Sequence, residues 1–234
     1  MTTQEKKDAL VSKERLDFDD LCTIMQILRS EEGCVWDREQ DHHSIRSSLI
    51  EEAYEVIEAI DTDDPVLLRE ELGDLLFQVV FHACIEEEEG RFCMGDVIHD
   101  ISHKMIHRHP HVFSTVQVKD SEEVLSNWEA IKTEEKQRNT LVDRLRAIPP
   151  MLPALMRATT VGKKAELFAD RSCGDALDEL AAQVEEMRSC EAPTSEQIGA
   201  LLMTVTHLSR LAKVDAEEAL SHHTDRVIDK IAEN

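Results

Sequence analysis

The sequence predicts an all-α protein built from two tandem helical units. Only seven glycines and six prolines occur in 234 residues, and aromatic residues make up 4% of the chain. Leu, Glu, Ala, Met and Lys are abundant, and this balance favours helices over strands. A chain of this length lies between one domain and two, so two half-size helical units can each bury a small core.

The charge and the apolar pattern restrict the partners of the chain. A formal net charge of −23 argues against a nucleic-acid binder, which needs clustered Lys and Arg to contact phosphates. No apolar run approaches 18 residues, and the N-terminal segment 1–13 is polar, so we expect neither a membrane span nor a signal peptide. The six cysteines form no Cys-x-x-Cys pair and indicate reduced thiols in a cytoplasmic protein.

Apolar residues at helical spacing predict five helices before a proline-rich joint at 148–153. Asp17 or Asp19 is suited to cap the first helix, Asp64 and Pro65 to begin the third, and Gly90 to end it. The segment 31–37 has no helical period and is expected to be a loop that carries Trp36. The predicted helices span 17–29, 45–62, 66–89, 96–107 and 121–138.

The helical pattern after the joint repeats the first half in weakened form. The run Glu71–Val80 aligns with Gln197–Thr206 and keeps the glycine and the two leucines that follow it. The preceding helix aligns less securely, with 48–55 on 179–186. We therefore expect a first helical domain at 14–140, a linker at 141–158 and a second, degenerate domain at 159–234.

Four acidic residues of the first half are spaced to meet between two helices. Glu52 and Glu55 are three residues apart on one predicted helix, and Glu71 and Asp74 have the same spacing on the next. Converging carboxylates need a cation, and ligands that are all oxygen select Mg²⁺, or Mn²⁺, over zinc. Acidic residues at this spacing are also common on exposed helices, so spacing alone leaves the metal site and a solvated face both open.

The sequence resembles the MazG family of nucleoside triphosphate pyrophosphohydrolases. The similarity covers most of the first 158 residues. The runs that carry it are Ile24–Arg29, Gly33–Gln40, Glu51–Glu55, Glu71–Phe81, Glu89–Phe92, Arg108–Phe113, Trp128–Lys132 and Leu152–Ala158.

The resemblance implies a reaction and a role for each candidate residue. The family signature Glu-x-x-Glu followed by Glu-x-x-Asp falls on Glu52, Glu55, Glu71 and Asp74, which would ligate Mg²⁺. A nucleoside triphosphate would then be hydrolysed between the α and β phosphates to the monophosphate and pyrophosphate. The resemblance also makes Glu51 a candidate to orient or deprotonate the attacking water. In the same way Lys104 and Arg108 would contact the phosphates, and Trp36 would either contact the base or pack against the protein.

Two further interpretations follow from the same residues. The histidines His103, His107, His109 and His111 suggest zinc, but His-Pro-His belongs to the family pattern and no cysteine is suitably spaced, which disfavours that site. The family assembles its sites from helices of two subunits, so a homodimer is expected.

The second half departs from the family pattern. Gln183, Gln197 and Ala200 stand where Glu52, Glu71 and Asp74 stand in the first half, so the second domain is not expected to bind Mg²⁺ in the same way. This loss leaves an alternative open for the whole chain. It could be a regulatory or interaction module that binds nucleotides with little turnover.

Overall fold

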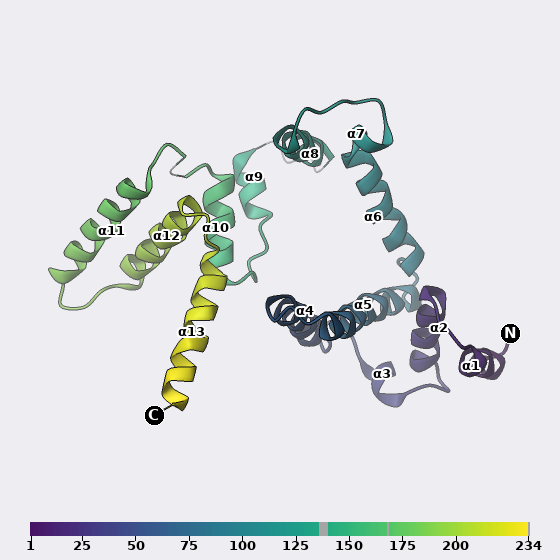
Figure 1. The fold of residues 1–234 in the computed structure, drawn as a ribbon. Helices are drawn as coiled ribbons and strands as arrows, with labels where there is room; N and C mark the ends of the chain where they lie inside the picture. The colour runs from purple at the N-terminus through teal and green to yellow at the C-terminus, as the bar shows by residue number, and fades with distance from the viewer. Residues whose placement is uncertain (136–139, 168, 234) are drawn as a thin grey trace. The chain divides into compact units, whose positions relative to one another are not determined.

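The computed structural model describes residues 1–135, 140–167 and 169–233 and forms two compact units, Met1–Val124 and Leu125–Asn234. Within these described residues every regular element is a helix, as the ribbon in Figure 1 shows. The prediction of an all-α fold is therefore confirmed. None of the described helices combines the length and the apolar character needed to cross a membrane.

The first unit contains the predicted helices within about two residues of their expected ends, together with three short ones that were not predicted. Thr2 begins α1 with a capping box to Glu5, a signal that the sequence does contain. The expectation of a loop at 31–37 was wrong in part, because α3 begins at Val35, and five residues are too few to show a helical period. The helices are α1 (Thr3–Ser12), α2 (Phe18–Arg29), α3 (Val35–Glu39), α4 (Arg46–Asp61), α5 (Pro65–Glu88), α6 (Met94–Arg108) and α7 (Pro110–Phe113).

The expected caps are present. Asp17 accepts a hydrogen bond from the Asp20 amide at the start of α2. Asp64 accepts from the amides of Val66 and Leu67, and Pro65 occupies the first turn of α5. Gly90 follows the end of α5 with a φ of +66°, a conformation that favours glycine.

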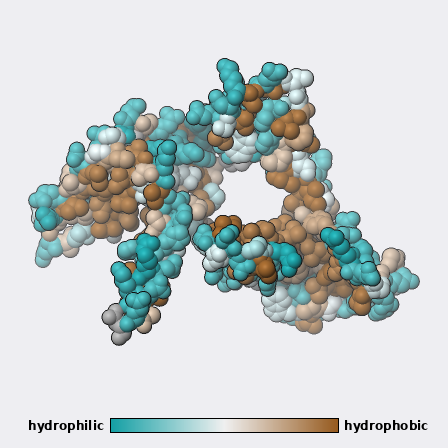
Figure 2. Space-filling model, viewed as in Figure 1, coloured by the Kyte–Doolittle hydropathy of each residue, from teal (hydrophilic) through white to brown (hydrophobic). Residues whose placement is uncertain are grey.

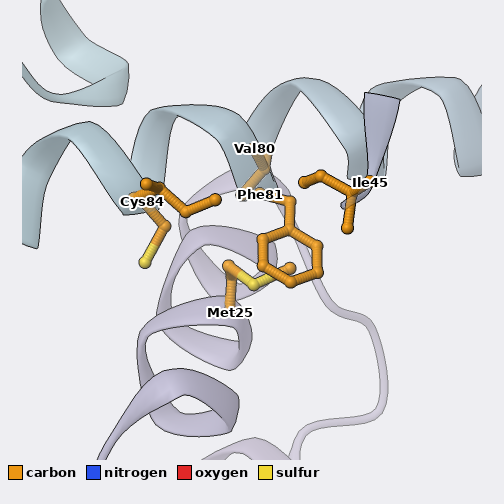
Figure 3. Packing of buried hydrophobic residues seen from close by; sticks show 6 residues of the cluster. Met25, Ile45, Val80, Phe81 and Cys84 are labelled. Atoms are coloured by element: carbon orange, nitrogen blue, oxygen red, sulfur yellow. The ribbon is translucent and has the colours of Figure 1, made fainter. Parts of the chain in front are cut away.

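The core of the first unit lies where α2 crosses the C-terminal half of α5 (Figure 3). Arg29 borders this core: it is 9% exposed, forms two hydrogen bonds of 2.7 Å with Glu88, and places its guanidinium over the Phe81 ring. A buried arginine is tolerated here because its charge is paired. The buried apolar side chains of the cluster are Met25, Ile45, Val80, Phe81, Cys84 and Ile85.

The apolar side chains in the N-terminal half of α5 are only partly buried. Leu72 and Leu76 lie there and are 49% and 38% exposed. The N-terminal half of α5 packs against α4, whereas α2 covers only the C-terminal half of α5. Apolar side chains consequently remain exposed on α4 and on the N-terminal half of α5, and Figure 2 shows such hydrophobic surface.

The second unit is built around the pair α11 and α12, with α10 packed between α12 and α13. The helix expected at 121–138 is seen as α8, which ends at Glu135, and the rest of that prediction lies outside the described residues. The segment 141–158 holds α9 and the start of α10, and its role as a linker stays a prediction. The helices are α8 (Ser121–Glu135), α9 (Leu141–Arg146), α10 (Ala154–Lys164), α11 (Cys173–Arg188), α12 (Ser195–Leu211) and α13 (Ala216–Ala232).

Candidate metal and nucleotide site

The turn between α4 and α5 brings acidic side chains of both helices together. Asp63 adopts a φ of +52° in this turn, and the two helices pack side by side. Glu52 and Glu55 of α4 and Glu71 of α5 each offer a carboxylate oxygen, and these oxygens lie within 4.8 Å of one another. Three of the four predicted ligands therefore form one cluster, which we call the acid cluster.

Asp74, the fourth predicted ligand, is exposed and does not belong to this close group. Its charge nevertheless reaches the cluster, because it contributes to raising the pKa of both Glu52 and Glu71. Asp74 lies one turn after Glu71 on α5 and is thus at the edge of the cluster.

Ionisation of the acid cluster is less favourable than that of free carboxyl groups. Burial is the main cause that raises the pKa of Glu71, followed by the charges of Glu55 and Asp74. Burial also leads the causes that raise the pKa of Glu52, followed by Asp74 and Glu55. Carboxylates that are partly desolvated and repel one another are suited to a divalent cation, which would remove the repulsion.

Gln78 is a neighbour of the cluster that the sequence analysis missed. It is 8% exposed, and its amide acts on Glu52 by lowering the pKa of that carboxyl group. Its Oε1 atom is buried without a hydrogen-bond partner among the described residues. The position could have been found from the spacing, because Gln78 lies one turn beyond Asp74 on α5.

Glu51 and Trp36 lie at exposed positions. Glu51 precedes Glu52 on α4 but is not a member of the close carboxylate group. Trp36 is 60% exposed on α3, and its backbone carbonyl accepts a hydrogen bond from the Gln40 side chain. The exposed ring adds little to the core of this chain, and the contact of Trp36 with a base stays a prediction.

Lys104 and Arg108 lie on α6, which leads away from the acid cluster. The cluster sits in the N-terminal half of α5, whereas α6 follows its C-terminal end and diverges from it (Figure 1). Lys104 is exposed, and Arg108 is 7% exposed and interacts with other groups of the chain. A single chain does not place these two predicted phosphate ligands beside the carboxylates.

The second unit contains a counterpart of the acid cluster in which Glu186 is the one matched acid that remains. The Gln197 Nε2 atom lies 3.5 Å from a carboxylate oxygen of Glu186, and Gln183 donates a hydrogen bond of 3.0 Å to Thr204. The structure thus brings together the residues that the internal alignment matched to the acid cluster. These matched residues help to line a pocket of about 420 Å³ between α11 and α12. The residues that line it are Gln183, Glu186, Thr194, Glu196, Gln197 and Ala200.

Comparison with known proteins identifies the family. The model of the MazG nucleotide pyrophosphohydrolase domain matches residues 40–113, which contain the whole acid cluster. The nucleoside triphosphate pyrophosphohydrolase/pyrophosphatase MazG of Thermotoga maritima is 39% identical over 91% of this chain and 83% of its own length. The chain belongs to the MazG family.

Two further MazG relatives show how far the similarity extends. The nucleoside triphosphate pyrophosphohydrolase of Escherichia coli K12 is 42% identical over 89% of this chain and 83% of its own length. The uncharacterized protein YabN of Bacillus subtilis is 39% identical over 90% of this chain but only 44% of its own length. The similarity spans both units, and MazG membership confirms the predicted enzyme class, a nucleotide pyrophosphohydrolase.

Proposed function

We propose that this chain hydrolyses nucleoside and deoxynucleoside triphosphates between the α and β phosphates, giving the monophosphate and pyrophosphate in a Mg²⁺-dependent reaction. The observation that carries the proposal is the convergence of Glu52, Glu55 and Glu71 within 4.8 Å, with Asp74 at the edge. The relatives named nucleoside triphosphate pyrophosphohydrolases support the substrate class.

The chemistry of the donor set fits Mg²⁺, with Mn²⁺ as an alternative. All ligands are carboxylate oxygens, which these ions prefer. The raised pKa values of Glu52 and Glu71 reflect burial first and then repulsion between the carboxylates, which a cation relieves. When bound, the ion would hold phosphate oxygens and make a water molecule more acidic. The pocket in the second unit offers amides at two of the matched positions and is not proposed as a second metal site of this kind.

The residues around the cluster have distinct proposed roles. Glu51, exposed beside the cluster on α4, orients or deprotonates the attacking water. Lys104 and Arg108 neutralise phosphate charge that the acidic surface of the chain would otherwise repel. Trp36 contacts the base through its exposed ring.

A homodimer is the assembly that this site calls for. Lys104 and Arg108 lie on α6, which leads away from α4 and the N-terminal half of α5, so a second copy would supply them or reposition α6. Apolar side chains exposed on α4 and α5 would be covered in the same interface. They include Ile50, Tyr54, Ile57, Ile60, Val66, Leu72 and Leu76. Light scattering at micromolar concentration should give twice 26.6 kDa, and a monomer mass would contradict this part of the proposal.

Pyrophosphate release from a panel of ribo- and deoxynucleotides tests the activity. With Mg²⁺ present, Glu71→Gln and Asp74→Asn should lower the rate by about 100-fold or more, because each removes one of the four proposed carboxylate ligands. Glu186→Gln, on the matched helix of the second unit, is the control and should keep the wild-type rate. Equal rates in all four proteins would reject the proposal.

The alternative is a nucleotide-binding regulatory module with little turnover, and the loss of acids in the second unit favours it. This module would bind nucleotides with Mg²⁺ in calorimetry but would form no monophosphate. Accumulation of monophosphate at enzyme-like rates therefore decides between the two. The unpaired state of all six cysteines supports a cytoplasmic location for either function.

A further inference from the structure

We infer that α6 carries a second metal site, separate from the acid cluster, in which exposed histidines bind a divalent transition-metal ion such as Zn²⁺ or Ni²⁺. His99, His103 and His107 are spaced four residues apart, and all three are exposed. Residues four apart share one face of a helix. This spacing is the one by which two helical histidines bind zinc in metalloprotease motifs.

The ring geometry is close to that of a chelating pair. The ring centroids of His99 and His103 are 6.1 Å apart, and those of His103 and His107 are 6.3 Å apart, with interplanar angles of 32° and 19°. Two imidazoles that bind one tetrahedral ion through nitrogens at about 2.0 Å place their centroids roughly 5 Å apart. Small side-chain rotations on an exposed surface close this difference.

His103 is the ligand that both pairs share. His99 and His107 are two helical turns apart, on opposite sides of His103, so they cannot bind the same ion as each other on a straight helix. The site therefore takes one ion, held by His103 together with either neighbour, and water completes the coordination. His107 also interacts with another group of the chain, so the pair of His99 and His103 is the more accessible of the two.

The donor chemistry separates this site from the acid cluster. Imidazole nitrogens suit Zn²⁺, Ni²⁺ and Cu²⁺, whereas Mg²⁺ prefers oxygen ligands. Asp96 and Asp100 lie near His99 in the sequence, whereas Lys104 and Arg108 directly follow His103 and His107, so the local charge favours a cation at the His99 end of the histidine row.

The structure changes the set of histidines that the sequence suggested. His109 is engaged with the Met105 carbonyl oxygen at 2.6 Å and follows the end of α6, and His111 lies on α7. Neither belongs to the exposed face of α6. His99, which was not part of the earlier set, does.

Calorimetric titration of the full chain with NiCl₂, and separately with ZnCl₂, tests the site. Both titrations are done in excess MgCl₂, so that the acid cluster is saturated and the result does not depend on the proposed hydrolysis. Wild type should bind one ion at this site, and His103→Gln should weaken binding by at least about tenfold, because both pairs lose their common ligand. The double variant His99→Gln/His107→Gln should lose as much affinity. Each of the single variants His99→Gln and His107→Gln should lose less affinity.

His223→Gln is the matched control. His223 is exposed on α13 and has Ala219 and Val227 one turn away instead of histidines, so its loss should leave the affinity unchanged. Circular dichroism of each variant verifies that α6 is folded. The inference is overturned if wild type binds neither ion, or if folded His103→Gln binds both ions as tightly as wild type, which would place them on thiols or elsewhere.

Discussion

The Nδ1 atoms of His42 and His82 lie 2.7 Å apart, and the two rings stack with centroids 5.0 Å apart. His42 lies in the segment that leads into α4, and His82 lies on α5. This contact therefore links that segment to α5, the second helix of the acid cluster. The Nε2 atom of His42 lies 2.5 Å from Glu86, which also forms two hydrogen bonds with Arg91. Only one hydrogen fits between the two Nδ1 atoms, so the network is intact when the pair is not doubly protonated there.

This network makes stability depend on pH. Burial, and then the charge of His42, lowers the pKa of His82. The unfolded chain therefore binds a proton at His82 more readily than the folded chain does, and stability falls as pH drops below the ordinary histidine value of 6.5. Hydrogen bonding to Arg91 and then to His42, against an opposing effect of burial, lowers the pKa of Glu86 to about 2. Its contribution is present above its ordinary value of 4.5 and is lost only as pH falls towards about 2.

We predict that the first unit loses stability between pH 7.5 and pH 5.5 and that His82→Phe loses less. Phenylalanine keeps a ring against His42 but cannot be protonated. Urea unfolding followed by Trp36 fluorescence in a Trp128→Phe background restricts the signal to the first unit. His43→Gln, an exposed neighbour without a ring contact among the described residues, should behave as wild type. Equal pH dependence in wild type and His82→Phe would contradict the prediction.

Mg²⁺ should stabilise the folded chain through the acid cluster. A ligand that binds only the folded state at 100 times its dissociation constant adds about 2.7 kcal/mol, which a thermal melt detects. Glu55→Gln should remove most of the Mg²⁺-dependent rise in melting temperature, whereas Glu186→Gln in the second unit should retain it. A full rise in Glu55→Gln would show that the ion binds elsewhere.

In the absence of metal, the acid cluster should lower the stability of the folded chain. The pKa of Glu71 is raised in the folded chain, mainly by burial, so ionisation of this group opposes folding. The penalty is absent at acidic pH and complete once the pH exceeds the folded pKa. In EDTA at neutral pH, Glu71→Gln should therefore raise the melting temperature, and the gain should vanish at pH 4. A lower melting temperature at neutral pH would show that Glu71 forms a stabilising contact.

The sequence was sufficient for the parts of the fold that depend on local chemistry. The caps Asp17 and Asp64 and the stop at Gly90 act on their own helix ends, and the three-residue spacing of Glu52 with Glu55 follows from helix geometry. The convergence of α4 with α5 also followed, because a short turn forces neighbouring helices to lie side by side.

The parts that were missed depend on tertiary packing. Leu72 and Val80 both carry apolar side chains on α5, and only the position of α2 leaves the first exposed and buries the second. His82 was overlooked because a polar residue within an apolar stripe has no signal of its own until its neighbours are known. The distance of Lys104 from the acid cluster likewise depends on the direction in which α6 leaves α5.

Phe81 tests where the core lies. Its side chain is 1% exposed within the cluster that joins α2 and α5, so Phe81→Ala should lower the free energy of unfolding of the first unit by about 3 to 5 kcal/mol. Phe113, which is 59% exposed on α7, provides the control: Phe113→Ala should change this free energy by less than about 0.5 kcal/mol. Urea unfolding at pH 7.5 measures both. Similar losses in the two variants would contradict this core.

Two glycines should respond in opposite directions to alanine. A Cβ at Gly33 would lie 2.1 Å from the Ile27 carbonyl oxygen, so the backbone before α3 must shift. A Cβ at Gly73, between Glu71 and Asp74, would meet nothing within 4 Å. Gly33→Ala should therefore destabilise the first unit by more than about 1 kcal/mol, and Gly73→Ala should stabilise it by about 1 kcal/mol.

Gly73→Ala should also affect the stability of the single chain and the affinity of the proposed dimer in opposite directions. If a second copy packs on this face of α5, as the proposed dimer requires, the added methyl group of Gly73→Ala interferes with close helix approach while the single chain gains stability. Dissociation measured by analytical ultracentrifugation should then occur at a higher concentration for Gly73→Ala than for wild type. Leu167→Ala, on an exposed side chain of the second unit, should leave dissociation unchanged. An unchanged dimer in Gly73→Ala would place the interface away from this part of α5.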